Sequence, residues 1–335
     1  MSDWREAAEW PDVDVVMPIR NEAEHLGAAL AAVRSQEYPG RVRIFLGVGP
    51  SDDETMEIAL ELADGSDDLV VVDNPAGVTP SGLNVAIRAG SAPVVVRVDG
   101  HSELSDGYIR RAIETMRATG AANVGGRQVP VPTTPFEEAV AAATTSWLGT
   151  GGASYRVGGE PGPVDTVFLG VFDRAAIEAV GLFDERLIRN QDYELNIRLR
   201  GAGGTVWFDP DLWVGYRPRG SWRALARQYY EYGYWKAVVL RMYPESARLR
   251  QVVPPMGVLG GLGSSLLALR WRRFGIVPVA GALIVATEAI RGSSHTPATP
   301  CRTAAVLSTI PVSWTVGLVR GARTPRSASR SPRPR

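Results

Sequence analysis

The stretch Ala92-Pro-Val-Val-Val-Arg-Val-Asp99-Gly-His101 decides the fold class of this chain. Its β-branched apolar run lacks polar alternation and therefore predicts a strand buried on both faces, as in a parallel sheet. Ligands of open α/β sheets bind outside the carboxyl ends of strands, where Asp99 and His101 are expected. A carboxylate and an imidazole two residues apart suit Mg²⁺ or Mn²⁺. The alternative is that Asp99 forms an Asx-turn or caps the following helix.

The elements predicted around this stretch alternate between strand and helix. Parallel strands joined by helical crossovers follow from this alternation, so the fold class is α/β with a nucleotide-binding type of sheet. No G-x-G-x-x-G follows the first strand and no G-x-x-x-x-G-K-[ST] occurs, which argues against dinucleotide-binding enzymes and P-loop NTPases. The expected strands span 13–17, 42–48, 69–72 and 94–98, and the expected helices span 22–35, 51–63, 79–89 and 108–118.

The charges of the chain are segregated although the formal net charge of its 335 residues is zero. After residue 245 there are thirteen arginines and one acid, Glu288, whereas the part before it holds 23 bases and 35 acids. This split indicates an acidic domain followed by a basic segment that meets an anionic surface. The single Cys301 excludes an internal disulfide framework. The first residues show no secretory signal, so we expect the catalytic part in the cytoplasm.

The middle of the chain contains two stretches with open interpretations. The glycine-rich segment 149–162 is expected to be a mobile loop, followed by a strand at 164–169 and a helix at 190–200. A long helix at 221–242 is dense in aromatic and cationic side chains. Such a helix suits sugar stacking, a membrane-interface belt or simple packing of its aromatic stripe in the core.

The tail contains three apolar runs, at 252–269, 274–290 and 303–319. The first is uncharged over 18 residues, which is just long enough for a transmembrane helix. Proline and glycine interrupt all three runs, so buried helices of a soluble domain remain the alternative. The arginine-rich ending suits an anionic cytoplasmic leaflet and favours the membrane. If the catalytic domain and this ending are both cytoplasmic, the number of membrane crossings must be even. One of the three runs would then lie in the membrane interface, and the arginines at 270–273 favour the first run for this position.

Taken together, these stretches resemble family 2 glycosyltransferases of the GT-A fold, in particular their ExoA-type succinoglycan-biosynthesis branch. The resemblance covers about residues 13 to 243 and extends weakly into the tail. Each motif is weak alone, and their common order is what makes the resemblance specific. The motifs are Pro18-Ile-Arg-Asn21-Glu22, Ser51-Asp-Asp53-Glu-Thr55, Leu83-Asn84, Arg97-Val-Asp99-Gly-His101, Asn190-Gln-Asp192-Tyr-Glu194-Leu-Asn196 and Gln228-Tyr-Tyr-Glu-Tyr-Gly-Tyr-Trp235-Lys.

The resemblance implies roles for individual residues. Asp192 falls on the catalytic base of the family, although an acid interacting with a helix N-terminus is the structural alternative. A divalent metal, Mn²⁺ or Mg²⁺, is expected on Asp99 and on His101, which replaces the second acid of the family's metal motif. The acceptor side is expected at Gln191, Gly170 and Trp235. The nucleotide-sugar donor is expected to contact Pro18, Arg20, Glu22, Asp53, Asn84 and Asp99.

The chain also departs from the family pattern. The Asp-Asp-x-Ser pattern of the family is incomplete, because Gly49 and Pro50 precede Ser51, and Gln191 stands where the family usually has a glutamate. Glu231 occupies the arginine position of the Gln-x-x-Arg-Trp motif of processive members, which favours the addition of a single sugar. A non-catalytic subunit that binds nucleotide-sugars and scaffolds polysaccharide assembly is the competing interpretation. A nucleotidyltransferase is disfavoured, because no lysine-rich phosphate loop follows the first strand.

The sequence therefore predicts a membrane-associated, inverting, metal-dependent glycosyltransferase of exopolysaccharide biosynthesis. It is expected to use a UDP-sugar and a lipid-linked or saccharide acceptor, with its catalytic domain on the cytoplasmic side of the cell membrane and no nucleic-acid partner. Three segments are expected: a GT-A domain at 1–245, membrane-associated helices at 246–320, and a disordered basic tail at 321–335.

Overall fold

The computed structural model describes residues 4–294 and 296–324, so the expected tail lies outside the described residues from position 325 onward. The chain divides into two compact units. The sheet unit comprises residues 1–129 and 158–216, and the helical unit comprises 130–157 and 217–335. This division by packing differs from the boundary expected at residue 245, because helix α10 (Trp222–Met242) packs with the helices that follow it. The expected functional division at that residue stays a prediction.

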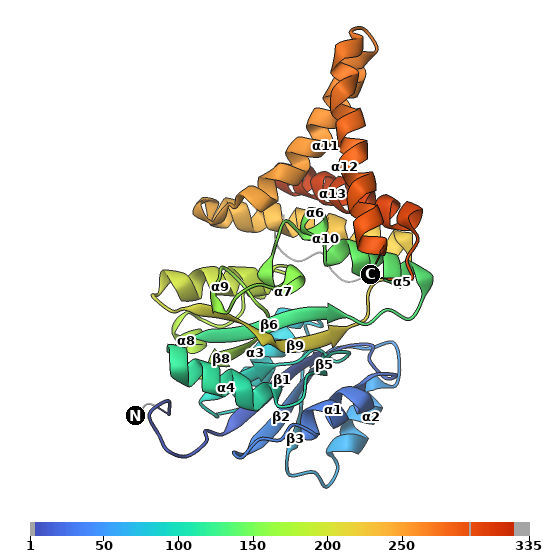
Figure 1. The fold of residues 1–335 in the computed structure, drawn as a ribbon. Coiled ribbons are helices and arrows are strands. Elements are labelled where there is room, and N and C mark those ends of the chain that lie inside the picture. Colours follow the sequence, from blue (N-terminus) through green and yellow to red (C-terminus); the bar gives the residue numbers. More distant parts are fainter. Residues whose placement is uncertain (1–3, 295, 325–335) are drawn as a thin grey trace. The chain divides into compact units, whose positions relative to one another are not determined.

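The sheet unit is built on a mixed sheet (Figure 1). In the described residues its strand order is β3-β2-β1-β4-β8-β6-β9-β5, with β7 paired to β9. Strands β1 to β4 run parallel, and β8 is antiparallel to both β4 and β6. The strands are β1 (Val13–Ile19), β2 (Val42–Val48), β3 (Leu69–Asp73), β4 (Val94–Arg97), β5 (Glu103–Leu104), β6 (Asn123–Pro130), β7 (Gly162–Pro163), β8 (Phe168–Asp173) and β9 (Val206–Tyr216).

Helices cover both faces of this sheet, and the alternation of strand side chains explains why. Val94 and Val96 of β4 point into one hydrophobic cluster, whereas Val95 between them points into another. The first cluster contains residues of α1 (Leu26–Arg34), α2 (Thr55–Ala63) and α4 (Tyr108–Thr119). The second contains residues of α3 (Thr79–Ala89), α8 (Arg174–Ala179) and α9 (Gln191–Gly201). Because both faces are covered, the parallel strands are predominantly apolar, as expected from the sequence, and each contains one charged residue.

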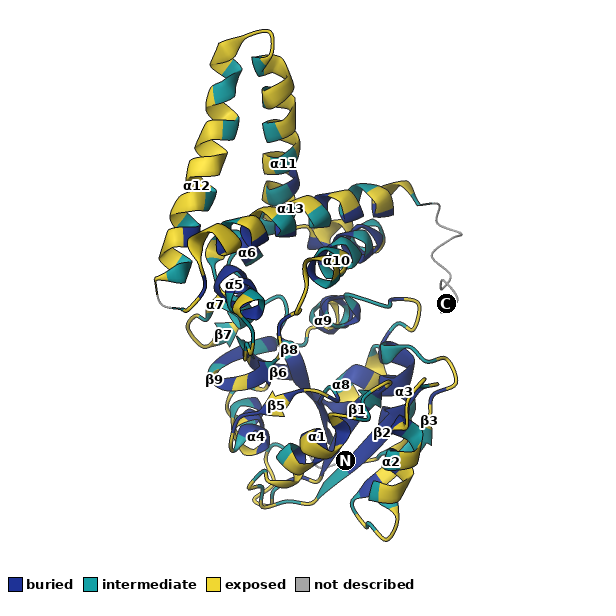
Figure 2. Cartoon of the chain, turned by 90° about the vertical axis from the view of Figure 1, so that its right-hand side faces the viewer, coloured by how far each residue is buried: buried dark blue, intermediate teal, exposed yellow. Residues whose placement is uncertain are grey.

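The helical unit has its own hydrophobic cluster, formed mainly by α5 (Pro135–Thr144), α10 and α13 (Pro300–Arg323). Helices α11 (Leu249–Ala268) and α12 (Ile276–Ser293) leave most of their apolar side chains exposed (Figure 2). Three segments, Leu249–Ala268, Arg272–Ser293 and Pro300–Arg323, are long and apolar enough to cross a membrane. Their most apolar windows are 6%, 6% and 33% buried, respectively, so the first two lack a protein environment for their apolar surface. These three apolar helices correspond to the three apolar runs expected from the sequence.

Most predicted elements are present, and three expectations are wrong. The strand expected at 164–169 lies instead at Phe168–Asp173, because pairing of Val171 with Val96 of β4 selects the later of two apolar windows. The segment expected as a loop at 149–162 contains the short helix α7 (Ser154–Val157), and α6 (Trp147–Thr150) overlaps its start. The helix after the second strand starts at Thr55, with Glu54 rather than Ser51 or Asp52 at its N-cap.

Candidate active site

Arg97, the last residue of β4, joins two carboxylates that are far apart in the sequence. Its Nε and Nη2 donate to Oδ1 of Asp99 at 3.1 and 2.9 Å, and its Nη1 donates to Oδ1 of Asp192. Arg97 is only 4% exposed, whereas the side chains of Asp99 and Asp192 are 23% and 33% exposed. The structure therefore brings together the predicted metal-binding acid and the predicted base at the carboxyl end of β4.

The charge of this guanidinium is secured by its two partners. Burial alone would lower the pKa of Arg97, but the charges and hydrogen bonds of Asp192 and Asp99 outweigh burial and raise the pKa above its usual value. A buried cation of this kind is stable only where acids pair with it. The two carboxylates therefore supply the charge that compensates the buried guanidinium.

The turns after β1 and β2 are tied together next to this site. Asn21 has a positive φ of 54°, a conformation that asparagine tolerates better than most residues. Its side-chain oxygen accepts from the N–H of Asp52 at 2.8 Å, and its own N–H donates to Oγ of Ser51 at 3.1 Å. The N–H of Glu22 donates to Oγ1 of Thr55 at 2.9 Å. The Pro18-to-Glu22 motif and the Ser51-to-Thr55 motif thus form one surface.

Asp53 lies within these joined turns. Its carboxylate accepts from the hydroxyl and the N–H of Thr55 and, at 3.3 Å, from the N–H of Ala23. The hydrogen bond from the Thr55 hydroxyl, followed by these N–H groups, holds the pKa of Asp53 below its usual range although burial acts in the opposite sense. Asp53 therefore stays ionised at neutral pH and stabilises the turn. Its predicted contact with a nucleotide would take place at this turn. Arg20, close by in sequence, donates to the carbonyl of Gly77 at 3.3 Å.

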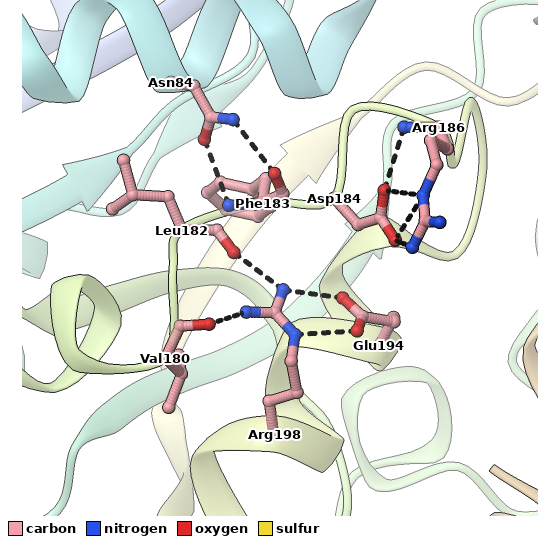
Figure 3. A network of polar contacts seen from close by, with 8 residues as sticks. All are labelled: Asn84, Val180, Leu182, Phe183, Asp184, Arg186, Glu194 and Arg198. Atoms are coloured by element: carbon pink, nitrogen blue, oxygen red, sulfur yellow. Dashed lines mark hydrogen bonds and ion pairs between the residues drawn. The ribbon is translucent and has the colours of Figure 1, made fainter. Parts of the chain in front are cut away.

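Helix α9 carries Asp192 and is fixed by a network of polar contacts behind it (Figure 3). Glu194, 1% exposed, pairs with Arg198 one turn later through two contacts of 2.7 Å. The same guanidinium donates to the carbonyls of Val180 and Leu182, which precede the segment leading into α9. The predicted base, Asp192, thus lies on a helix whose first turns are attached to the adjacent loop.

Asn84 anchors the same segment from α3. Its amide nitrogen donates to the carbonyl of Phe183 at 2.9 Å and to Glu185 at 2.8 Å, and its oxygen accepts from the N–H of Phe183 at 3.0 Å. Asn84 is 2% exposed. These contacts give Asn84 a role in positioning the approach to Asp192, and direct contact with the donor stays a prediction.

Comparison with known proteins places this site in a family. The family model for glycosyl transferase family 2 matches residues 14–181, which include Asp53 and Asp99. The succinoglycan biosynthesis protein ExoA of Rhizobium meliloti (strain 1021) is 32% identical over 268 residues, covering 79% of this chain and 80% of that protein. The chain is a family 2 glycosyltransferase of the ExoA type. The prediction from the sequence motifs is thereby confirmed.

Two further comparisons bear on distant similarity and on the fold. A dolichyl N-acetyl-alpha-D-glucosaminyl phosphate 3-beta-D-2,3-diacetamido-2,3-dideoxy-beta-D-glucuronosyltransferase of Methanococcus voltae is 24% identical over 68% of this chain and 74% of that protein. The structure of the mannosyltransferase PcManGT from Pyrobaculum calidifontis in complex with GDP-Man and Mn²⁺ has a TM-score of 0.63 at 15% identity, covering 94% and 88% of the two chains. This likeness shows the GT-A fold.

The glycosyltransferase has a side-chain set that fits a divalent cation held jointly with a diphosphate. In the described residues, no group of three or more His, Cys, Asp or Glu side chains is arranged to hold a metal by itself. Mg²⁺-type sites commonly need only one or two protein ligands, because substrate phosphates supply the others. Nδ1 of His101 contacts Oε1 of Glu22 at 2.8 Å. A carboxylate only accepts, so Nδ1 carries the proton and a neutral ring presents its lone pair on Nε2, the usual arrangement for a metal-binding histidine.

The three residues predicted on the acceptor side have different surroundings. Gln191 is the first residue of α9 and is 5% exposed. Gly170 lies inside β8, where a Cβ atom would collide with the side chain of Asn123, so packing alone accounts for the glycine. Trp235 belongs to the helical unit and is buried, with its ring 5.5 Å from that of Tyr234. Contact of these residues with an acceptor stays a prediction.

Sequence analysis missed the residues that hold the site together. Arg97 was quoted within a motif but given no role, although one cation closing an otherwise apolar strand beside an acid is a recognisable signal. Glu194 and Arg198 were missed as well, although a spacing of four residues on a helix predicts a pair on one face. The link from Asn84 to Phe183 spans 99 residues and has no sequence signal.

Proposed function

We propose that this glycosyltransferase transfers one hexose from a UDP-sugar, with inversion, to a lipid-linked saccharide acceptor at the cytoplasmic face of the cell membrane. The observation that carries the proposal is the meeting of Asp99 and Asp192 on the guanidinium of Arg97. One acid of the predicted metal motif and one predicted base thereby flank a single point at the carboxyl end of β4. A direct displacement needs these two groups, one for the leaving group and one for the nucleophile.

The chemistry at this point is a single displacement at the anomeric carbon. Asp192 accepts the proton of the acceptor hydroxyl as the hydroxyl oxygen forms a bond to that carbon. The bond from the carbon to the diphosphate oxygen breaks on the opposite side, so the configuration inverts. Asp99 and His101 would hold a divalent cation, which supplies charge neutralisation for the departing diphosphate. The joined turns that contain Glu22 and Asp53 would hold the nucleotide.

The exposed apolar helices support a lipid-linked acceptor. Leu262 and Leu266 of α11 and Leu283 of α12 are each at least 60% exposed, which is unfavourable in water and favourable in hydrocarbon. A membrane anchor in the same chain keeps the catalytic unit near the bilayer surface, where lipid-linked acceptors lie. A soluble acceptor gives no reason for such an anchor.

Calorimetric titration of the full chain in detergent with UDP, GDP and dTDP, with and without Mn²⁺, tests the donor site. We expect tight UDP binding only with Mn²⁺, and loss of that binding in Asp99→Asn. Asp106→Asn is the matched control, because Asp106 is an exposed acid seven residues further on. Preference for another nucleotide would correct the donor, and absence of any metal-dependent binding would overturn the donor site.

Transfer of radiolabelled sugar from the preferred donor to membrane lipids tests the enzyme. Asp192→Asn should lower kcat by about 10²- to 10⁴-fold, the usual contribution of a general base, while donor binding is retained. A wild-type protein that binds the donor but never transfers or hydrolyses it would instead support the scaffold interpretation. Retention of configuration in the product would contradict the displacement described above.

A further inference from the structure

The bridge formed by Arg97 joins the two acids of the candidate site, Asp99 and Asp192. Nη1 faces Asp192, whereas Nε and Nη2 both face one oxygen of Asp99. A guanidinium is planar and rigid, so two carboxylates bonded to different edges of it are held at a fixed separation and orientation. The partners come from the segment after β4 and from the first turn of α9, which the sequence separates by 93 residues (from 99 to 192).

Because Arg97 is buried, its charge needs acidic partners. Arg97 is 4% exposed, and a buried cation without partners strongly destabilises a fold. The described contacts use Oδ1 of each acid, so each carboxylate turns one oxygen to the arginine and has its second oxygen outside the bridge. The side chains of Asp99 and Asp192, at 23% and 33% exposed, are reachable from solvent. Arg97 itself is not.

We propose that Arg97 is a positioning residue that sets Asp192 in register with the donor bound at Asp99. This inference rests on the proposed function, because it assigns Asp192 to the acceptor hydroxyl and Asp99 to the donor side. Arg97 touches neither substrate. It acts by holding the carboxylate of the base against rotation, so that the second oxygen of Asp192 meets the hydroxyl on the side opposite the leaving group.

The Arg97→Lys variant tests whether the charge of Arg97 or the shape of its guanidinium matters. Lysine keeps the positive charge but lacks the fork that bonds two acids on different edges. In Arg97→Lys we expect kcat for sugar transfer to fall by about 10²-fold, the effect of a misplacement of roughly 1 Å at a reacting group. The donor KM should change little, because donor-binding groups remain in place.

Arg174→Lys is the matched control for loss of a buried guanidinium. Arg174 is 8% exposed and also pairs with two acids, with Asp14 at 2.8 Å and with Glu178 at 3.2 Å. It makes none of the described contacts with Asp99 or Asp192. We expect Arg174→Lys to lower Tm at least as much as Arg97→Lys while kcat stays near the wild-type value. If the two variants lost kcat equally, Arg97 would have only a structural role, and the inference would be overturned.

A double-mutant cycle completes the test. If Arg97 acts through Asp192, Arg97→Lys should cause no further loss of kcat in the Asp192→Asn background, whereas independent effects multiply. If the losses of kcat caused by the two substitutions multiply in the double mutant, the inference is overturned. The proposed function is still upheld in that case, as long as the wild type transfers sugar. A wild type without transfer or hydrolysis would overturn the proposed function instead. The same cycle measured by Tm, with Arg174→Lys as the uncoupled reference, then still decides whether Arg97 holds Asp192.

Discussion

The contact between Glu22 and His101 bears on how an Asp-x-His motif holds a metal. Sequence resemblance assigned Glu22 to the nucleotide, but in the structure its carboxylate meets Nδ1 of the imidazole at 2.8 Å. A carboxylate at this nitrogen fixes the ring orientation and makes the other nitrogen a better ligand. The His101 side chain is 50% exposed, so this contact contributes to fixing the orientation of its ring. Glu22 is therefore expected to support the metal more than the nucleotide.

Replacement of Glu22 by alanine separates these two roles. Loss of the carboxylate removes the contact at Nδ1 that orients the imidazole ring, and we expect the affinity for Mn²⁺ to fall by about 10- to 100-fold, as for other residues that orient a metal-binding histidine. Metal-free binding of the nucleoside diphosphate should change little. Titration followed by Mn²⁺ electron paramagnetic resonance measures the first quantity, and calorimetry without metal measures the second.

Two further variants act as controls for this prediction. Glu24→Ala removes an acid that is 89% exposed in the same turn and should leave both affinities unchanged. Glu22→Gln keeps an oxygen that accepts from Nδ1 and should fall between the wild type and Glu22→Ala. If Glu22→Ala weakens metal-free nucleotide binding as strongly as it weakens Mn²⁺ binding, the carboxylate holds the nucleotide directly.

At the scale of elements, helices α10 and α13 approach so closely that only glycine fits between them. A Cβ atom at Gly317 would collide with the carbonyl of Tyr230, and one at Gly321 would collide with that of Tyr234. Gly233 of α10 makes the reciprocal approach to Trp314 of α13. The spacing of Gly317 and Gly321 is the small-residue pattern of closely packed apolar helices. This packing explains why α13 is more buried than α11 and α12.

Gly317→Ala is expected to destabilise this helix pair. The added methyl group has no space and forces the helices apart, at a cost of about 1–3 kcal/mol for overpacking. Thermal unfolding of the full chain in detergent should show a lower Tm. In the control, Gly257→Ala on α11, a Cβ meets nothing within 4 Å, so the better helix propensity of alanine should leave Tm equal or higher. A Tm unaffected by Gly317→Ala would contradict the close approach of the two helices.

The strands and helices show which structural features the sequence patterns can predict. The four parallel strands were predictable because apolar runs that alternate with helical segments pack favourably as a parallel sheet covered by helices. The strand at Phe168–Asp173 was misplaced because two overlapping apolar windows satisfy the same rule, and only pairing with β4 distinguishes them. Asp99 and Asp192 could be singled out from their motifs, and their roles stay predictions. The bridge between them was not predictable, because contact over 95 residues depends on how strands and helices meet.

At the scale of the whole molecule, the distribution of arginine along the helices suggests an orientation in the membrane. Helices α11 and α12 are each long enough to span about 30 Å of hydrocarbon and are joined by a short turn at 269–275. Arginines 270, 272 and 273 lie in this turn. Arginines 248, 250 and 291 lie at the other ends of these two helices, and Arg302 lies in the first turn of α13, which follows α12. The positive-inside rule then favours a cytoplasmic position for those ends and for the catalytic unit.

The burial of the three apolar helices also bears on which of them cross. Sequence analysis favoured the first run, which corresponds to α11, as the interfacial segment because of the arginines that follow it. Helices α11 and α12 are equally unburied, whereas α13 has one third of its apolar window covered. An α11–α12 pair that crosses and returns, with α13 packed on α10 at the interface, gives an even number of crossings. In this arrangement the turn at 269–275 lies on the far side.

The single cysteine of the chain provides a direct test of this topology. Cys301 is exposed in the first turn of α13, on the side expected to be cytoplasmic. A membrane-impermeant maleimide should label it in inside-out vesicles and spare it in right-side-out vesicles. In a Cys301→Ser, Arg272→Cys variant the pattern should reverse, because Arg272 is exposed in the far turn. Labelling of both cysteines from the same side would mean that the α11–α12 pair does not cross, and a reversed pattern for both would place the catalytic unit outside the cytoplasm.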